Sequence, residues 1–198
     1  MDIRRDFYLE KLIKRKSNGL IKVITGIRRC GKSYLLNNIF YHHLLDSGVE
    51  ADHIIRFAFD SADDLYLIGE SLIQIEKEKR GADPEKFMAY IRSKTTGEGI
   101  YYLLLDEIQM LDCFEAVLNG YLRKENIDVF VTGSNAKLLS KDIATEFAGR
   151  GDEIHMYPLS FAEFMSVYNG DKYTGLSEYM LYGGIPLVVL RDGAGDKA

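Results

Sequence analysis

The chain has 198 residues, of which 46% are hydrophobic, and its formal net charge is −5. This length and apolar content favour one domain with a sizeable core, with at most an appended helical piece. Two cysteines exclude a disulfide-stabilised framework. We find no charged-then-apolar leader and no long apolar span, so we expect a soluble, cytoplasmic protein without a membrane partner.

Basic charge is concentrated at the N-terminal end. Residues 1–33 contain ten Lys or Arg and three acidic residues, which gives +7 there and −12 in the remainder. Three of these cations belong to the motif described next, and the others lie on a helix-like stretch as a polar face. We therefore expect residues 1–19 to form a helix that packs on the core, and nucleic-acid binding is the alternative.

The next segment, residues 26–33, matches the phosphate-binding pattern GxxxxGK[ST] between an apolar run and a helix-like run. Its glycines allow backbone N–H groups to approach a polyphosphate, and the following helix adds its positive N-terminus. Lys32 is expected to reach the β- and γ-phosphates, and the Ser33 hydroxyl to ligate Mg²⁺. The predicted nucleotide-binding residues are Gly26, Ile27, Arg28, Arg29, Cys30, Gly31, Lys32, Ser33 and Tyr34.

Apolar runs alternate with helix-like stretches along the chain. The runs are continuous, which is typical of strands buried on both faces of a parallel sheet, so the pattern predicts an α/β fold. The predicted strands are Leu20–Thr25, Ile54–Phe59, Ile100–Leu105, Ile127–Thr132 and Ile154–Tyr157. The predicted helices are Lys32–Leu45, Leu65–Lys79, Pro84–Lys94, Asp112–Lys124 and Phe161–Tyr168.

Two strand ends carry further polar groups. Asp106 and Glu107 end the third strand, where a phosphate-loop enzyme needs carboxylates. We expect Asp106 to hold Mg²⁺ opposite Ser33, and Glu107 to act as general base toward water. After the fourth strand, Asn135 is expected to contact the attacking water or the γ-phosphate; Ser134 is a weaker candidate, and ordinary turn chemistry is the alternative.

Together, residues 26–33, Asp106-Glu107 and 132–135 resemble the corresponding motifs of AAA-superfamily ATPases. The resemblance is closest to a prokaryotic group of predicted ATPases whose domain precedes a C-terminal domain of uncharacterised role. Further matches lie at residues 105–109, 133–140, 148–150, 157–164 and 182–186. The resemblance implies a P-loop NTPase fold with a five-stranded parallel sheet in the order 5-1-4-3-2. It also implies that Arg150 is suited to be an arginine finger, acting from a neighbouring subunit; a surface cation is the alternative.

These features predict a Mg²⁺-dependent ATPase module that binds ATP and ADP and couples its nucleotide state to a client protein or a C-terminal domain. The alternatives are a nucleotide-gated switch with little turnover and, less favoured, a small-molecule kinase. The expected layout is an N-terminal helix at 1–19, an ATPase core at 20–158 and a helical extension at 159–198, truncated before a further domain. Assembly into a homo-oligomer would supply Arg150 in trans.

The remaining polar residues have simpler expected roles. Cys30 lies inside the phosphate loop, where its N–H matters most and oxidation is a minor alternative. The four histidines show no ligand spacing that predicts a metal site, and Asp60 is expected to be a loop or capping residue. Tyr8, Leu9 and Leu12 fit either a core-facing helix or a surface for the adenine ring.

Overall fold

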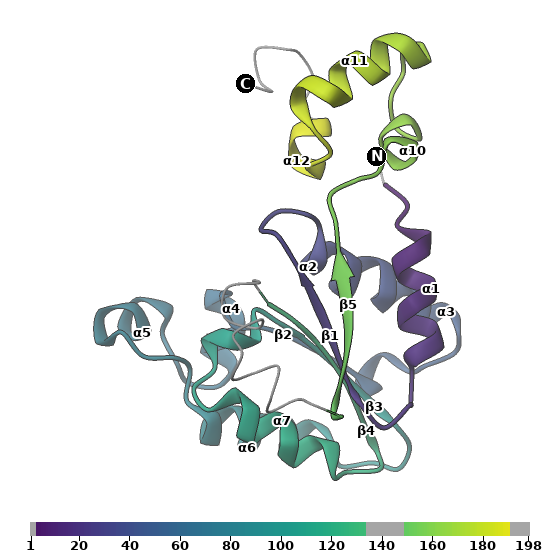
Figure 1. Ribbon diagram of the computed structural model, residues 1–198. Helices are drawn as coiled ribbons and strands as arrows, with labels where there is room; N and C mark the ends of the chain where they lie inside the picture. Colours follow the sequence, from purple (N-terminus) through teal and green to yellow (C-terminus); the bar gives the residue numbers. More distant parts are fainter. Residues whose placement is uncertain (1–2, 134–148, 191–198) are drawn as a thin grey trace.

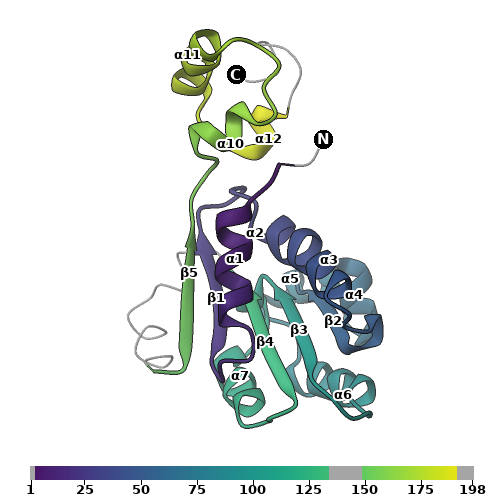
Figure 2. The ribbon, with the colours of Figure 1, turned by 90° about the vertical axis from the view of Figure 1, so that its right-hand side faces the viewer.

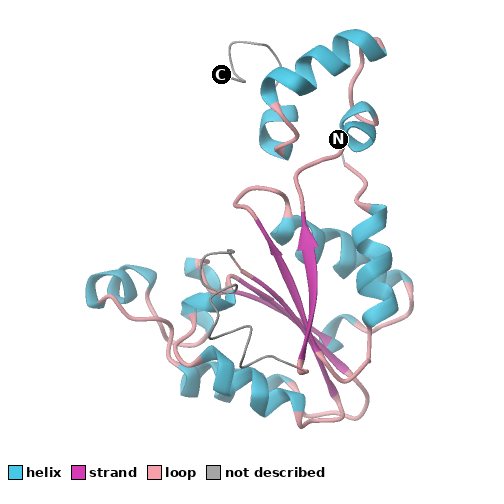
Figure 3. Cartoon of the chain, in the orientation of Figure 1, coloured by secondary structure: helices cyan, strands magenta, loops and turns pink. Residues whose placement is uncertain are grey.

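The protein folds around a single five-stranded sheet (Figures 1 and 3). A computed structural model describes residues 3–133 and 149–190. The strands are β1 (Ile21–Gly26), β2 (Ile54–Ala58), β3 (Tyr101–Asp106), β4 (Ile127–Thr132) and β5 (Gly151–Met156). Strands β1 to β4 each contain two or more β-branched or aromatic residues, which suit a pleated and buried backbone.

All neighbouring strands are parallel, and the order is β2-β3-β4-β1-β5. The expected order 5-1-4-3-2 is therefore confirmed. Every residue of β3 and β4 is buried, as expected for a sheet covered on both faces. Because the strands are parallel, their carboxyl ends lie at the same edge of the sheet. The loop after β1 and the acidic end of β3 therefore share this edge, and β4 lies between the two strands.

Helices cover both faces of the sheet. They are α1 (Asp6–Arg15), α2 (Lys32–Tyr34), α3 (Tyr41–Asp46), α4 (Ala62–Leu67), α5 (Leu72–Glu78), α6 (Pro84–Lys94) and α7 (Phe114–Leu122). One core cluster joins α1, α3 and the π-helical segment Leu35–Phe40 to the sheet, and a second joins α4 to α7 to its other face. The sheet therefore forms the middle of three layers (Figure 2).

Several predicted elements differ from the structure. The predicted helix Leu65–Lys79 is two helices, α4 and α5, separated near Gly69, whose φ of +69° ends the first of them. The predicted helix Lys32–Leu45 contains a π-helical segment, Leu35–Phe40, between α2 and α3. Strand β5 begins at Gly151, because its charged residues Asp152 and Glu153 pair with β1 despite interrupting the apolar run.

A small helical extension follows β5. It contains α10 (Phe161–Met165), α11 (Lys172–Tyr182) and α12 (Pro186–Val189), and it stands beyond the carboxyl end of β5, apart from the layers around the sheet (Figure 1). Ser160 begins α10 with a capping box that includes Glu163. Within the described ranges, no helix has the length and apolar character needed to cross a membrane.

Candidate functional site

The loop after β1 has the backbone geometry that its glycines predict. Gly26 and Gly31 have φ values of +147° and +101°, which side-chain-bearing residues rarely adopt. A Cβ built on Gly26 would lie 2.2 Å from the carbonyl oxygen of Met156 and 3.0 Å from Cys30 Sγ. Only glycine therefore fits at this position, where the loop passes directly against the end of β5.

Lys32 lies across this loop. Its side chain is buried, with 5% of the residue exposed, and its Nζ donates to the carbonyl oxygens of Gly26 and Ile27 at 3.1 Å each. Ser33 follows in the first turn of α2 and is exposed. The ammonium and the helix N-terminus thus occupy one end of the loop, the arrangement that favours a bound phosphate.

The end of β3 carries a hydrogen-bonded acidic group. Asp106 is 5% exposed; its Oδ1 accepts the Thr132 hydroxyl of β4, and its Oδ2 accepts Asn37 Nδ2 at 3.3 Å. Asn37 lies one helical turn after Ser33, so Asp106 faces the helix that begins at the phosphate loop. A carboxylate with remaining lone pairs is an oxygen ligand of the kind that suits Mg²⁺.

Glu107 is held next to Asp106 in an unusual backbone conformation. Its φ is +51°, and its N–H donates to Thr132 Oγ1 at 3.2 Å, while its carboxylate accepts Gln109 Nε2. Thr132 therefore connects both carboxylate residues through one hydroxyl group. No sequence motif singles out Thr132 or Asn37 for these contacts, because the contacts depend on strand order and on the π-helical segment.

Asp60 also belongs to this edge, although only a capping or loop role was expected for it. Partial burial raises the pKa of Asp60, and the nearby Asp106 carboxylate raises it further. The backbone confirms this closeness, since Phe59 N–H donates to the carbonyl oxygen of Asp106 at 3.1 Å. The neighbouring Asp64 accepts the N–H of Ala58, so Asp64 stabilises the β2–α4 turn.

Cys30 is completely buried behind the phosphate loop. Burial raises the pKa of its thiol, and this effect exceeds the opposite influence of Lys32 and Arg5. A buried, protonated thiol is a poor nucleophile. The structure therefore favours packing over oxidation as the role of this side chain.

Two other predicted site residues are not placed beside the loop. Asn135 lies outside the described residues. Arg150 is exposed immediately before β5; its carbonyl oxygen accepts Ile21 N–H, and its Nη1 donates to Asn119 Oδ1 at 3.2 Å. This is the edge of the sheet at which the parallel strands begin, opposite the edge that carries the phosphate loop. Any contact between Arg150 and a nucleotide would therefore involve the site of another chain.

The N-terminal helix packs against the core of the sheet. Leu12 is fully buried there, and Leu9 packs partly buried against it. Tyr8 is also buried, with 6% of the residue exposed, and it borders a hollow of about 890 Å³ between α1 and the helical extension, together with Tyr157, Glu163 and Tyr179. This hollow begins where β5 ends, next to the loop-facing residue Met156.

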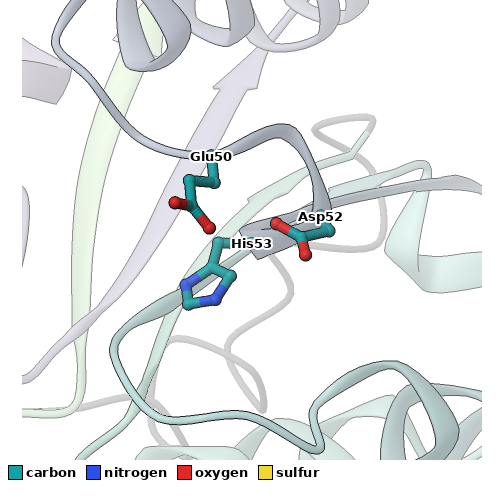
Figure 4. A group of neighbouring side chains, drawn as sticks. All are labelled: Glu50, Asp52 and His53. Atoms are coloured by element: carbon teal, nitrogen blue, oxygen red, sulfur yellow. The ribbon is translucent and has the colours of Figure 1, made fainter.

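One group of potential metal ligands lies elsewhere. Glu50, Asp52 and His53 bring ligand atoms within 4.8 Å of one another at the start of β2 (Figure 4). The two acids are exposed, while the His53 ring stacks on Tyr101 with centroids 4.3 Å apart and its Nδ1 lies 3.3 Å from the Ile100 carbonyl oxygen. These contacts give His53 a packing role at the edge opposite the phosphate loop.

Comparison with known families is decisive for the fold. The family model described as "AAA domain" matches residues 18–165, which include the phosphate loop and the acidic end of β3. The chain belongs to the AAA domain family. This match confirms the resemblance to AAA-superfamily P-loop ATPases.

Curated relatives of this AAA domain are uncharacterized proteins. One from Haemophilus influenzae is 37% identical over 196 residues, covering 96% of this chain and 45% of the relative. Another from Methanocaldococcus jannaschii is 32% identical over 208 residues, covering 96% of this chain and 40% of the relative. The chain therefore spans less than half the length of these relatives.

Solved structures support the same fold. The Aeropyrum pernix ORC1 protein, solved in complex with DNA, has a TM-score of 0.52 at 13% identity, covering 90% of this AAA domain chain and 50% of that chain. A DNA polymerase III gamma subunit-related protein from Thermotoga maritima has a TM-score of 0.51 at 12% identity, covering 92% and 56%. At such low identity these likenesses concern the fold alone.

Proposed function

We propose that this AAA domain binds ATP with Mg²⁺, hydrolyses it, and couples its nucleotide state to a partner. The observation that carries the proposal is the shared edge on which the phosphate loop, Asp106 and Glu107 lie, connected through Thr132 and Asn37. The expected partners are a second copy of the chain and either a client protein or a further part of the longer polypeptide. A cytoplasmic location agrees with this activity.

Each residue has a distinct role in this proposal. Backbone N–H groups of residues 26–34 and the Lys32 ammonium bind the phosphates. Ser33 and Asp106 would hold Mg²⁺, which neutralises charge developing on the transferred phosphoryl group. Glu107 orients a water molecule and accepts its proton. Asn135 is proposed to sense the γ-phosphate, and Arg150 to act as a finger from a neighbouring subunit.

A nucleotide-gated switch with little turnover is the second candidate. It is favoured by the position of Arg150 at the amino edge of the sheet, since a single chain then receives no stabilisation of the transition state from that arginine. Binding alone would still require Lys32 and the loop. A kinase acting on a small molecule is less favoured, and labelled ATP with metabolite pools would reveal its phosphorylated product.

The two main candidates differ in their response to Glu107→Gln. For an ATPase, we expect the variant to retain ATP affinity while phosphate release falls at least about tenfold, as is usual for loss of a general base. For a switch, the substitution changes both ATP affinity and phosphate release little. Titration with ATP, ADP and GTP, with and without Mg²⁺, measures affinity, and phosphate release measures turnover.

Lys32→Ala supplies the binding test. We expect it to abolish detectable ATP affinity, whereas the variant Lys14→Ala retains it, because Lys14 is exposed and its amine pairs with Glu10 one turn away. Failure of the unmodified protein to bind either ATP or GTP would reject both candidates.

A further inference from the structure

Strand β2 is the last strand on one side of the sheet, and among the described strands it pairs with β3 alone (Figure 2). Successive residues of a strand direct their backbone N–H and C=O groups to alternate sides. Phe59 N–H donates to a carbonyl oxygen at the end of β3, whereas Ala58 N–H donates away from β3, to a carboxylate of α4. By this alternation, the N–H and C=O groups of Arg56 and the C=O group of Ile54 also point away from β3. We call this side of the strand the free edge of β2.

The free edge is short and centred on Arg56. Within residues 3–133 and 149–190, the outward groups of Arg56 and the C=O group of Ile54 have no hydrogen-bond partner. At one end, Ile54 N–H donates to the carbonyl oxygen of Ala51, and at the other, the Ala58 carbonyl oxygen accepts Ser61 N–H at 3.1 Å. Exposed backbone groups of this kind are a template for pairing with another extended chain.

A groove of about 600 Å³ runs along the free edge of β2. It is lined by Asn37 of the π-helical segment, by Arg56, and by Tyr90, Ser93 and Lys94 of α6. The π-helical segment and α6 belong to core clusters on opposite faces of the sheet. An extended segment added to β2 would therefore lie between the two helical layers, with alternate side chains directed toward each layer.

The Arg56 side chain leaves the backbone of the free edge open. Its Cζ lies 4.0 Å from the centroid of the Tyr41 ring, and its Nη1 donates to the Asn37 carbonyl oxygen at 3.3 Å. The guanidinium is thus held against one helical layer, and because the residue is exposed it retains N–H groups for a carboxylate. On the other layer, the half-buried Tyr90 ring packs on Phe57 with centroids 5.8 Å apart and offers an apolar contact.

These side chains specify what the free edge of β2 would accept. A residue placed opposite Arg56 has its side chain on the same face, where an opposite charge is favourable. Its two neighbours would face Tyr90, where apolar side chains fit. A second copy of the chain is disfavoured, because pairing the two free edges around Arg56 would place two guanidinium groups opposite each other.

We propose that the free edge of β2 binds an extended segment of a partner protein by strand addition, and that this segment carries an acidic residue flanked by apolar residues. The backbone of Arg56 and Ile54 supplies the hydrogen bonds, the Arg56 guanidinium selects the acidic residue, and Tyr90 contacts the apolar ones. The inference goes beyond the proposed nucleotide chemistry and does not depend on it.

Hydrogen exchange of single backbone amides, followed by NMR in the full chain, tests the position of the segment. The probe is a capped peptide in which valine alternates with threonine and a glutamate replaces the central threonine. We expect Arg56 N–H to exchange quickly in the free protein and slowly with the peptide, whereas Ile55 and Phe57 N–H, which face β3, exchange slowly in both states. The same peptide with methylated central backbone nitrogens should not bind.

Arg56→Glu tests the selection of charge. Fluorescence anisotropy should show that the unmodified protein prefers the glutamate peptide to its lysine counterpart, and that the variant prefers the lysine peptide. Each preference should reach up to about fivefold, the range of cross-strand charge pairs. Because the preference reverses rather than disappears, loss of folding cannot imitate the result.

Ser93→Trp tests the groove, because Ser93 is exposed on the α6 wall and a larger side chain would fill the space. We expect it to abolish peptide binding. Ser177→Trp is the matched control, since Ser177 is also an exposed helical serine whose hydroxyl donates to a carbonyl oxygen of its own helix. Circular dichroism checks that both variants are folded.

Three results would overturn the proposal. The unmodified protein could fail to bind the glutamate peptide, or it could bind the peptide while Arg56 N–H still exchanges quickly, which would place the segment elsewhere. Protection of Arg56 N–H that appears without peptide and increases with protein concentration would assign the free edge to a second copy instead. Nucleotide is absent from all these measurements, so none of the results bears on the proposed ATPase activity.

Discussion

At the scale of single residues, the Thr132 hydroxyl has an unusual share in the candidate site. It donates to Asp106 and accepts the N–H of Glu107, whose backbone lies in the left-handed region at φ +51°. Non-glycine residues adopt that region only where surrounding contacts stabilise it. Thr132 therefore orients both carboxylate residues through its hydrogen bonds.

We predict that Thr132→Val, which preserves shape but removes the hydroxyl, reduces phosphate release more than ATP affinity. Leaving a buried partner unsatisfied costs about 1–3 kcal/mol, which corresponds to about 5- to 140-fold in turnover. Steady-state kinetics over a range of ATP concentrations separates the two effects. Thr95→Val, which removes a hydroxyl that donates to the Ile91 carbonyl oxygen at 3.0 Å, is the control. Equal turnover in both variants would contradict the positioning role.

The sequence predicted some of these residues and not others for a physical reason. Lys32, Asp106 and Glu107 are set by local spacing around a strand end, so a motif identifies them. Thr132 and Asn37 act only through neighbours brought close by the β3–β4 register and by the π-helical segment. A single sequence contains no direct measure of either.

At the scale of elements, the segment that contains α4 and α5, between β2 and α6, is held in place by a cluster of charged side chains. Glu70, whose side chain is 2% exposed, accepts Arg80 Nη2 at 2.6 Å and Lys86 Nζ at 2.5 Å. Burial raises the pKa of Glu70, but the hydrogen bonds from Lys86 and Arg80 outweigh it and hold the pKa below the usual 4.5. Glu70 therefore connects the segment of α4 and α5 to the start of α6.

A depressed carboxyl pKa implies stability that is present above pH 4.5 and is lost as the pH falls through the lower, folded-state value. We predict that Glu70→Gln lowers the urea midpoint at pH 7 and that the difference from the unmodified protein shrinks toward pH 3. The exposed Glu125→Gln should show no such convergence. A difference that stayed constant across this range would show that Glu70 acts through shape alone.

The elements also show where sequence patterns are insufficient. Continuous apolar runs predicted β1 to β4 closely, because most residues of these strands are buried. Strand β5 is an edge strand, so Asp152 and Glu153 are tolerated there and the apolar run understates its length. The break at Gly69 within a single predicted helix was missed, since an isolated glycine is compatible with either a helix interior or its end.

At the scale of the whole molecule, the position of Arg150 bears on the proposed ATPase activity. The arginine and its own phosphate loop lie at opposite edges of one sheet, so the proposed role of Arg150 in the transition state would require a second chain. We predict that phosphate release per chain rises with protein concentration and that Arg150→Ala removes this rise while ATP affinity is retained. The exposed Arg123→Ala, near the same edge, is the control. A rate per chain independent of concentration would count against a trans-acting Arg150.

Strand β1, which leads into the phosphate loop, lies near the N-terminal end of the sequence, whereas the two strands that pair with it lie far along the chain. Lys22 pairs with Phe130 on one side and with Asp152 on the other, each more than a hundred residues further along. Such distant pairings slow folding and leave unpaired strand edges exposed during synthesis. The loop can therefore reach its final geometry only after β5 has been synthesised, because the Met156 carbonyl oxygen of β5 lies directly against Gly26.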